Sequence, residues 1–129
     1  MLKSGILNPH LLSLLARVRH SNTLVIADRG FPFWPQIETV DISLVDGIPS
    51  VLDVFNAIRP NYVIGHAWIA EEFQGANNAG TREQFAAALD GILLTFEPHI
   101  EFKKRVPNAI GLIRTGDTVK FANIILESV

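Results

Sequence analysis

The chain has 129 residues, with 11 Lys and Arg against 13 Asp and Glu, four His and no Cys. The lack of Cys excludes thiol catalysis, Cys-based zinc sites and disulfides, and a net charge of −2 lacks the basic footprint of a general nucleic-acid binder. No apolar run approaches the roughly 20 residues that cross a membrane, and the first residues do not read as a secretory signal. We therefore expect one compact domain over residues 1–129, cytoplasmic, with neither nucleic acid nor membrane as a partner.

The first third of the chain predicts a helix, a strand and a shaped loop. Asn8-Pro9 is a helix-start signal, and the apolar residues that follow recur on one face, which predicts a helix over 9–19. Residues 23–27 are a β-rich apolar run without alternation, typical of a strand that is covered on both faces and here ends at Asp28. A glycine, two prolines and three aromatic residues make 29–35 an irregular loop.

The middle of the chain continues this alternation. The expected elements are a strand over 38–42, a helix over 49–58, a strand over 62–70 and an exposed connection over 74–80. Thr81 and Gln84 have the spacing of a capping box, which predicts a helix over 81–90.

The last third predicts more strands than helices. The expected elements are a strand over 92–96, a short helix over 99–105, and two strands over 109–114 and 121–126 joined by a turn around 115–117. Strands that alternate with helices predict a three-layer α/β sandwich with a mainly parallel, mixed sheet and an antiparallel pair near the C-terminus.

Asp28 is the first candidate for chemistry. Ligands of open α/β sheets usually bind beyond the carboxyl ends of the strands, where Asp28 is expected. Its carboxylate would either brace the turn at Gly30 or accept hydrogen bonds from a polar substrate, with the aromatic residues of 31–34 packing on the substrate's apolar faces. Sugars suit the second interpretation.

His20 and His99 are the candidate proton carriers. An imidazole with an ordinary pKa near ~6.5 can give or take a proton at neutral pH. On spacing alone, a surface histidine, or one that compensates a helix dipole, is the better interpretation of His20, and His99 has the same ambiguity. His10 and His66 fit solvent-facing or structural positions, and four scattered histidines are a poor metal signature.

Several blocks of sequence, in order and spacing, resemble one family along nearly the whole chain. The blocks are residues 3–8, 19–32, 46–50, 69–72, 99–103, 113–116 and 121–126. On these blocks the chain resembles the D-ribose pyranase / L-fucose mutarotase family of cytoplasmic sugar-ring isomerases.

The resemblance implies a role for five residues. It assigns proton transfer to His20 and substrate binding to Asp28, His99 and Asn123. The family's C-terminal motif carries a tyrosine before Ala-Asn or Gly-Asn, whereas this chain has Phe121, so one phenolic hydroxyl is absent. An apolar ring at this position favours a sugar with a methyl group or hydrogen at the facing carbon. The chain is also shorter than the pyranase pattern between Glu72 and His99.

The implied reaction is interconversion of the pyranose and furanose, or anomeric, forms of a ribose- or fucose-like monosaccharide. It needs a proton removed from the anomeric hydroxyl and one delivered to the ring oxygen, and it implies no metal or organic cofactor. The family also implies a ring-like homo-oligomer, a decamer, with sites near subunit boundaries. The alternative is a carbohydrate-binding or regulatory protein that keeps the pocket without turnover. For catalysis we expect His20 to lie near the Asp28 carboxylate.

Overall fold

The computed structural model describes residues 1–129 and contains a six-stranded sheet in the order β2-β5-β1-β6-β3-β4. All strands run in the same direction except β6, which lies antiparallel between β1 and β3. The strands are β1 (Thr23–Ala27), β2 (Glu38–Asp41), β3 (Ile64–Ala70), β4 (Leu93–Glu97), β5 (Gly111–Arg114) and β6 (Ile124–Ser128). The predicted mainly parallel, mixed sheet is confirmed.

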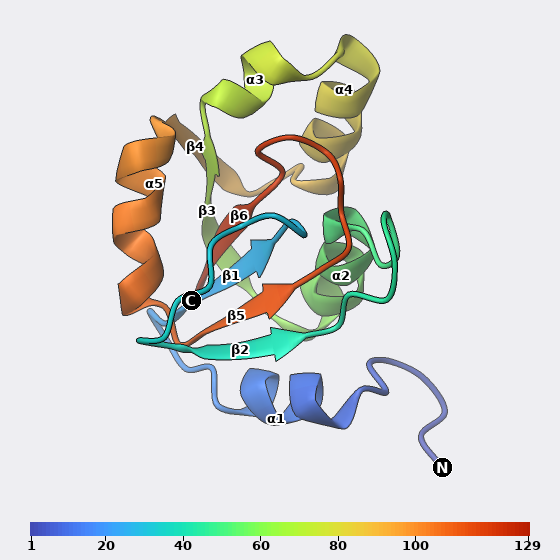
Figure 1. Cartoon of the computed structure of the whole chain (residues 1–129). Helices are drawn as coiled ribbons and strands as arrows, with labels where there is room; N and C mark the ends of the chain where they lie inside the picture. The colour runs from blue at the N-terminus through green and yellow to red at the C-terminus, as the bar shows by residue number, and fades with distance from the viewer.

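Helices cover both faces of the sheet and make three layers (Figure 1). On one face lie α1 (Pro9–Ala16), α2 (Val51–Ile58) and α4 (Ala79–Ala88), and on the other lies α5 (His99–Arg105). The short α3 (Glu72–Ala76) follows β3, and the 3-10 turns η1 (Arg59–Asn61) and η2 (Val106–Asn108) follow α2 and α5. None of these helices has the length and apolar character that a bilayer crossing requires.

Strand β1 is the centre of the core. Its side chains alternate between two apolar clusters: Leu24 and Ile26 join the cluster under α1, α2 and α4, whereas Val25 and Ala27 join the one under α5. Burial on both faces explains why the run shows no polar alternation, as predicted.

Two predicted helix starts have their caps in the expected region. The Asn8 Oδ1 accepts the Leu11 N–H at 2.9 Å, which confirms the predicted cap of α1, although that helix ends at Ala16 rather than at Arg19. Helix α2 begins at Val51 instead of Pro49, because Ser50 and Asp53 form a reciprocal capping box ahead of it.

The prediction for residues 74–90 was partly wrong. Part of the expected exposed connection is helical, since α3 extends to Ala76 and α4 already begins at Ala79. The cap of α4 is Asn78, whose Oδ1 accepts the Thr81 N–H at 2.9 Å, so Thr81 lies inside the helix instead of opening it. A competing cap three residues upstream thus replaced the Thr81 box.

The predicted hairpin near the C-terminus was wrong as well. Strands β5 and β6 do not pair with each other, because β1 lies between them and pairs with β5 in parallel and with β6 antiparallel. The segment 115–123 must therefore cross over the end of β1, and Figure 1 shows it arching there. The predicted antiparallel pairing exists, but its partners are β1 and β3.

This topology brings distant segments to one edge of the sheet, the edge that is formed by the ends of its strands. The carboxyl ends of β1, β4 and β5 and the amino end of β6 meet there, because β6 alone runs in the opposite direction. Asp28 follows β1, His99 lies just beyond β4, and Asn123 immediately precedes β6. The fold thus gathers chemistry-bearing residues from three separate parts of the chain.

Candidate functional site

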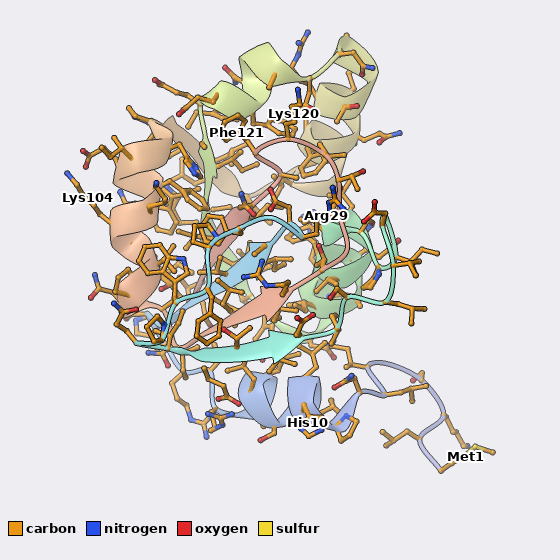
Figure 2. The ribbon with its side chains drawn as sticks, in the orientation of Figure 1. Met1, His10, Arg29, Lys104, Lys120 and Phe121 are labelled. Carbon is orange, nitrogen blue, oxygen red and sulfur yellow. The ribbon has the colours of Figure 1, made fainter.

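An open cavity of about 310 Å³ lies at this carboxyl edge. Figure 2 shows Arg29, Lys120 and Phe121 near this edge, on the β1 loop and the β5–β6 connection, well away from Met1 and His10. The lining residues are Asp28, Arg29, Gly30, Phe31, Pro32, His99, Asp117, Thr118, Val119, Lys120, Phe121 and Asn123. Four of the five residues that the sequence singled out therefore share one cavity: Asp28, His99, Phe121 and Asn123.

Asp28 is tied to both the turn that follows it and the start of β6. Its Oδ1 accepts the Gly30 N–H at 3.0 Å, and its own main-chain N–H donates to Asn123 Oδ1 at 2.7 Å. The carboxylate therefore braces the turn and also faces the cavity, so the two roles considered for Asp28 are compatible.

Burial raises the pKa of the Asp28 carboxyl above its ordinary value. Hydrogen bonds from the main chain of Gly30 and Phe31 and from the Asn123 side chain oppose this rise, and the nearby charge of Asp117 adds to it. Ionising the Asp28 carboxyl group therefore costs more free energy in the folded chain than in the unfolded chain.

His99 occupies the first position of α5, where its main-chain N–H donates to both carboxylate oxygens of Glu72 at 3.0 and 3.1 Å. Its ring lies among aromatic side chains, edge-on to Phe31 at 6.1 Å and to Phe121 at 5.2 Å between ring centroids. The Nδ1 atom is buried and has no hydrogen-bond partner within the chain.

These surroundings lower the pKa of His99. Burial is the main cause and the charge of Lys103 adds to it, while Glu72 and Asp28 act in the opposite direction. The imidazole is therefore neutral at neutral pH, with one ring nitrogen free to accept and the other to donate a hydrogen bond.

Phe121 and Asn123 enter the cavity from the β5–β6 connection. Phe121 has φ of 56°, a left-handed conformation that is unusual for a bulky side chain. Its neighbours hold this bend, because the Lys120 carbonyl accepts the Asn77 side-chain amide at 2.9 Å and Ala122 and Asn123 are buried. The Phe121 ring thus forms an apolar wall beside His99.

His20 does not join these residues within one chain, which corrects the expectation that it lies beside Asp28. It sits exposed in the turn before β1, where the Ser21 N–H donates to the carbonyl of Ser128 at the end of β6. Asp28 lies at the other end of β1, and a strand of five residues spans about 13 Å between its first and last Cα atoms. The expectation assumed that one copy of the chain supplies the whole sugar site, whereas an extended strand separates these two residues.

Comparisons with known proteins show which family the chain belongs to. The model of the RbsD / FucU transport protein family matches residues 1–129. The chain belongs to this family. It is 41% identical to a D-ribose pyranase of Geobacillus kaustophilus over 99% of this chain and 93% of that protein, and 38% identical to one of Corynebacterium glutamicum over 99% and 97%.

Solved structures of family members have the same fold. Bacillus subtilis RbsD complexed with D-ribose superimposes with a TM-score of 0.91 at 30% identity, over 99% of this chain and 97% of that one. The fucose mutarotase of Streptococcus pneumoniae in complex with L-fucose superimposes with a TM-score of 0.72 at 22% identity, over 94% and 91%, which shows the shared fold.

Sequence reasoning missed two polar residues that shape the site. Asp117 is 5% exposed and accepts the N–H groups of Val51 and Val119, both at 2.8 Å, while its carbonyl accepts the Arg29 N–H. Arg114, the last residue of β5, donates to main-chain carbonyls of the loop after β1. The rule that singled out Asp28, a polar residue at the carboxyl end of a buried strand, also fits Arg114, whereas Asp117 lies in the connection beyond β5.

The remaining histidines have no part in the cavity. His66 shares a hydrogen bond with Thr95 Oγ1 at 2.8 Å and stacks on Trp68, as expected of a structural residue. His10 lies in the first turn of α1. Nowhere in the chain do three His, Asp or Glu side chains gather in a way that could hold a metal ion.

The raised pKa of Asp28 predicts that Asp28→Asn stabilises the protein at neutral pH. The folded chain releases this proton less readily than the unfolded chain, so stability is lost as pH rises through the folded pKa, and the neutral amide avoids that loss. Thermal unfolding at pH 7 should show a higher midpoint for the variant. The gain should vanish below about pH 4, where both states of the parent bind the proton. A variant less stable than the parent at pH 7 would contradict this account.

Proposed function

We propose that the chain is a single-domain, cofactor-independent isomerase that interconverts the ring forms of a monosaccharide. The observation that carries the proposal is the convergence of a carboxylate, a neutral imidazole, an amide and an aromatic wall on one open cavity. Asp28 and Asn123 offer acceptors and donors for hydroxyl groups, and Phe121 offers a surface for the apolar face of a sugar. Family membership and the D-ribose pyranase relatives support the reaction.

The chemistry requires two proton transfers and no redox step. The anomeric hydroxyl loses a proton, the bond between the anomeric carbon and the ring oxygen breaks, and the ring oxygen gains a proton. The open aldehyde then recloses on its other face or through another hydroxyl. General acid and base catalysis contributes about 10²–10⁴-fold, which suffices for a reaction that already proceeds in water.

We further propose that His20 reaches the cavity from a second copy of the chain. His20 is exposed at the edge of the sheet opposite the cavity, so it is available to another molecule and remote from Asp28 of its own. The cavity is open to solvent along Pro32 and Lys120, which are both exposed and leave room for such an approach. His99 and Asp28 would then orient the sugar while His20 carries the protons. The resemblance to the family supports a cytoplasmic, ring-like decamer.

The reaction is tested by magnetisation-transfer exchange spectroscopy on a panel of pentoses, 6-deoxyhexoses and hexoses. We expect the parent protein to accelerate exchange between ring forms of at least one sugar, and His20→Ala to lower that rate by about 10²–10⁴-fold. His10→Ala, which changes an exposed histidine of α1, is the matched control and should keep the parent rate. Sugar signals that shift without faster interconversion would instead favour the carbohydrate-binding alternative.

The proposed sharing of the site is tested by complementation between two inactive variants. When His20→Ala and Asp28→Asn are co-expressed, mixed oligomers should regain about a quarter of the parent activity, because each site draws its two residues from different copies. The control is each variant expressed alone, and the oligomers of a single variant should stay inactive. Mixed oligomers without recovered activity, or a stable monomer in light scattering, would contradict a shared site.

The Phe121 wall bears on which sugar is preferred. Phe121 places an apolar ring edge-on to His99 where a tyrosine would add a hydroxyl group. A sugar hydroxyl directed at this wall would lose a hydrogen bond, at a cost of about 1–3 kcal/mol in a dry site. We therefore propose that this wall favours a sugar with a methyl group or a hydrogen at the facing carbon.

Phe121→Tyr tests this preference. The added hydroxyl should shift the ratio of affinities toward ribose and away from the methyl-bearing fucose by roughly tenfold or more, in line with one hydrogen bond gained. Binding is measured by titration of each sugar followed by NMR. Phe33→Tyr is the matched control, because Phe33 is 70% exposed and does not line the cavity. An unchanged ratio in Phe121→Tyr would overturn the idea.

A further inference from the structure

Arg114 joins the central sheet to the loop that carries Asp28. It is the last residue of β5, and its Cα pairs with Ala27 of β1 on one side and with Asp41 of β2 on the other. From there its guanidinium reaches the loop after β1 and donates to three main-chain carbonyls: Asp28 at 3.1 Å, Arg29 at 3.3 Å and Pro32 at 3.2 Å.

These three bonds matter because they fix the carbonyl groups of an irregular loop. Residues 28–32 belong to no helix or strand. Three of the loop's N–H groups are fixed: that of Asp28 by Asn123 Oδ1, that of Arg29 by the Asp117 carbonyl and that of Gly30 by the Asp28 carboxylate. No other group in the chain donates a hydrogen bond to the three carbonyls that Arg114 binds.

The chemistry of arginine suits this task. A guanidinium presents five N–H donors in a rigid plane, so several acceptors bound to it are fixed relative to one another. Arg114 forms no ion pair with any carboxylate, and the hydrogen bonds of its guanidinium go to main-chain carbonyls alone. It therefore acts through geometry, and a lysine ammonium could not reproduce the arrangement.

What the loop presents to the cavity depends on that shape. Asp28 supplies the carboxylate, and Phe31 is 5% exposed and packs edge-on against the His99 ring at 6.1 Å. A displaced loop would move the carboxylate and loosen the aromatic support of the imidazole together. Displacements near 1 Å can lower a catalysed rate by about a hundredfold.

We propose that Arg114 is a positioning residue of the sugar site, which sets the direction of the Asp28 carboxylate and the placement of His99 by clamping the carbonyls of the 28–32 loop. The inference rests on the proposed function, because it concerns how the same site is held ready for ring opening.

The test compares Arg114→Lys with Arg59→Lys. Arg59 is a matched control, because its guanidinium also donates to two main-chain carbonyls, those of Ala88 and Asp90, outside the cavity. At saturating sugar, Arg114→Lys should lower the exchange rate by about tenfold or more, whereas Arg59→Lys should keep it. Equal parent-like rates in both variants would overturn the proposal.

Two further measurements separate positioning from general stability. Millimolar methylguanidinium should restore part of the exchange rate of Arg114→Ala by occupying the vacated place, and it should do nothing for Arg59→Ala. A loss in Arg114→Ala that only follows the unfolded fraction, without rescue, would contradict positioning.

The last measurement does not depend on catalysis. In amide NMR spectra, Arg114→Lys should shift the Gly30 and Phe31 signals, and Arg59→Lys should leave them in place. If the parent protein accelerates ring exchange for no sugar, the proposed function is wrong. The shifts of the Gly30 and Phe31 signals still test whether Arg114 holds the loop. If the parent is active and the Gly30 and Phe31 signals do not move, the clamp itself is refuted.

Discussion

The site depends on the attachment of the β5–β6 connection to the end of β1. The Asp28 N–H donates to Asn123 Oδ1 across 95 residues of sequence, and Thr115 Oγ1 donates to the Ala27 carbonyl at 2.8 Å. Both bonds exist because β1 lies between β5 and β6, so that the chain leaving β5 must pass over β1 to enter β6. The same crossing places Phe121 and Asn123 opposite Asp28.

Burial has a common effect on Asp28 and His99, two of the ionisable residues that line the cavity. It raises the pKa of Asp28 and lowers the pKa of His99, which moves each group toward its uncharged form. A neutral imidazole and a carboxyl group can both exchange hydrogen bonds with the neutral hydroxyl groups of a sugar. This environment suits an uncharged sugar and a proton carried in either direction.

Local features of the sequence predicted the parts of the fold that local physics controls. The apolar run of β1, its end at Asp28 and the Asn8 cap follow from residue type and spacing alone. Partner choice does not, because β5 and β6 read as a hairpin until β1 is known to lie between them. The helix start predicted at Thr81 was wrong for a related reason, because Asn78 caps the helix three residues earlier.

The site divides along the same line. Asp28, His99, Phe121 and Asn123, which the family resemblance singled out, share the cavity, whereas His20, which the same resemblance assigned to the site, lies at the other end of β1 from Asp28. Arg114 stands at the carboxyl end of a predicted strand, but its role could not be assigned from sequence, because that role depends on three main-chain carbonyls that no side-chain pattern indicates. Which main-chain carbonyls a side chain can reach is known only when the conformation of the loop is known.

The contact between Glu72 and the start of α5 has a consequence for how this family can vary. Glu72, at the start of α3, holds the His99 main chain directly, while β3 and β4 run side by side beneath them. Between Asn77, which holds the Lys120 carbonyl, and β4, the polypeptide that includes α4 forms a closed excursion. Such an excursion can be trimmed or extended by evolution while the imidazole stays where it is.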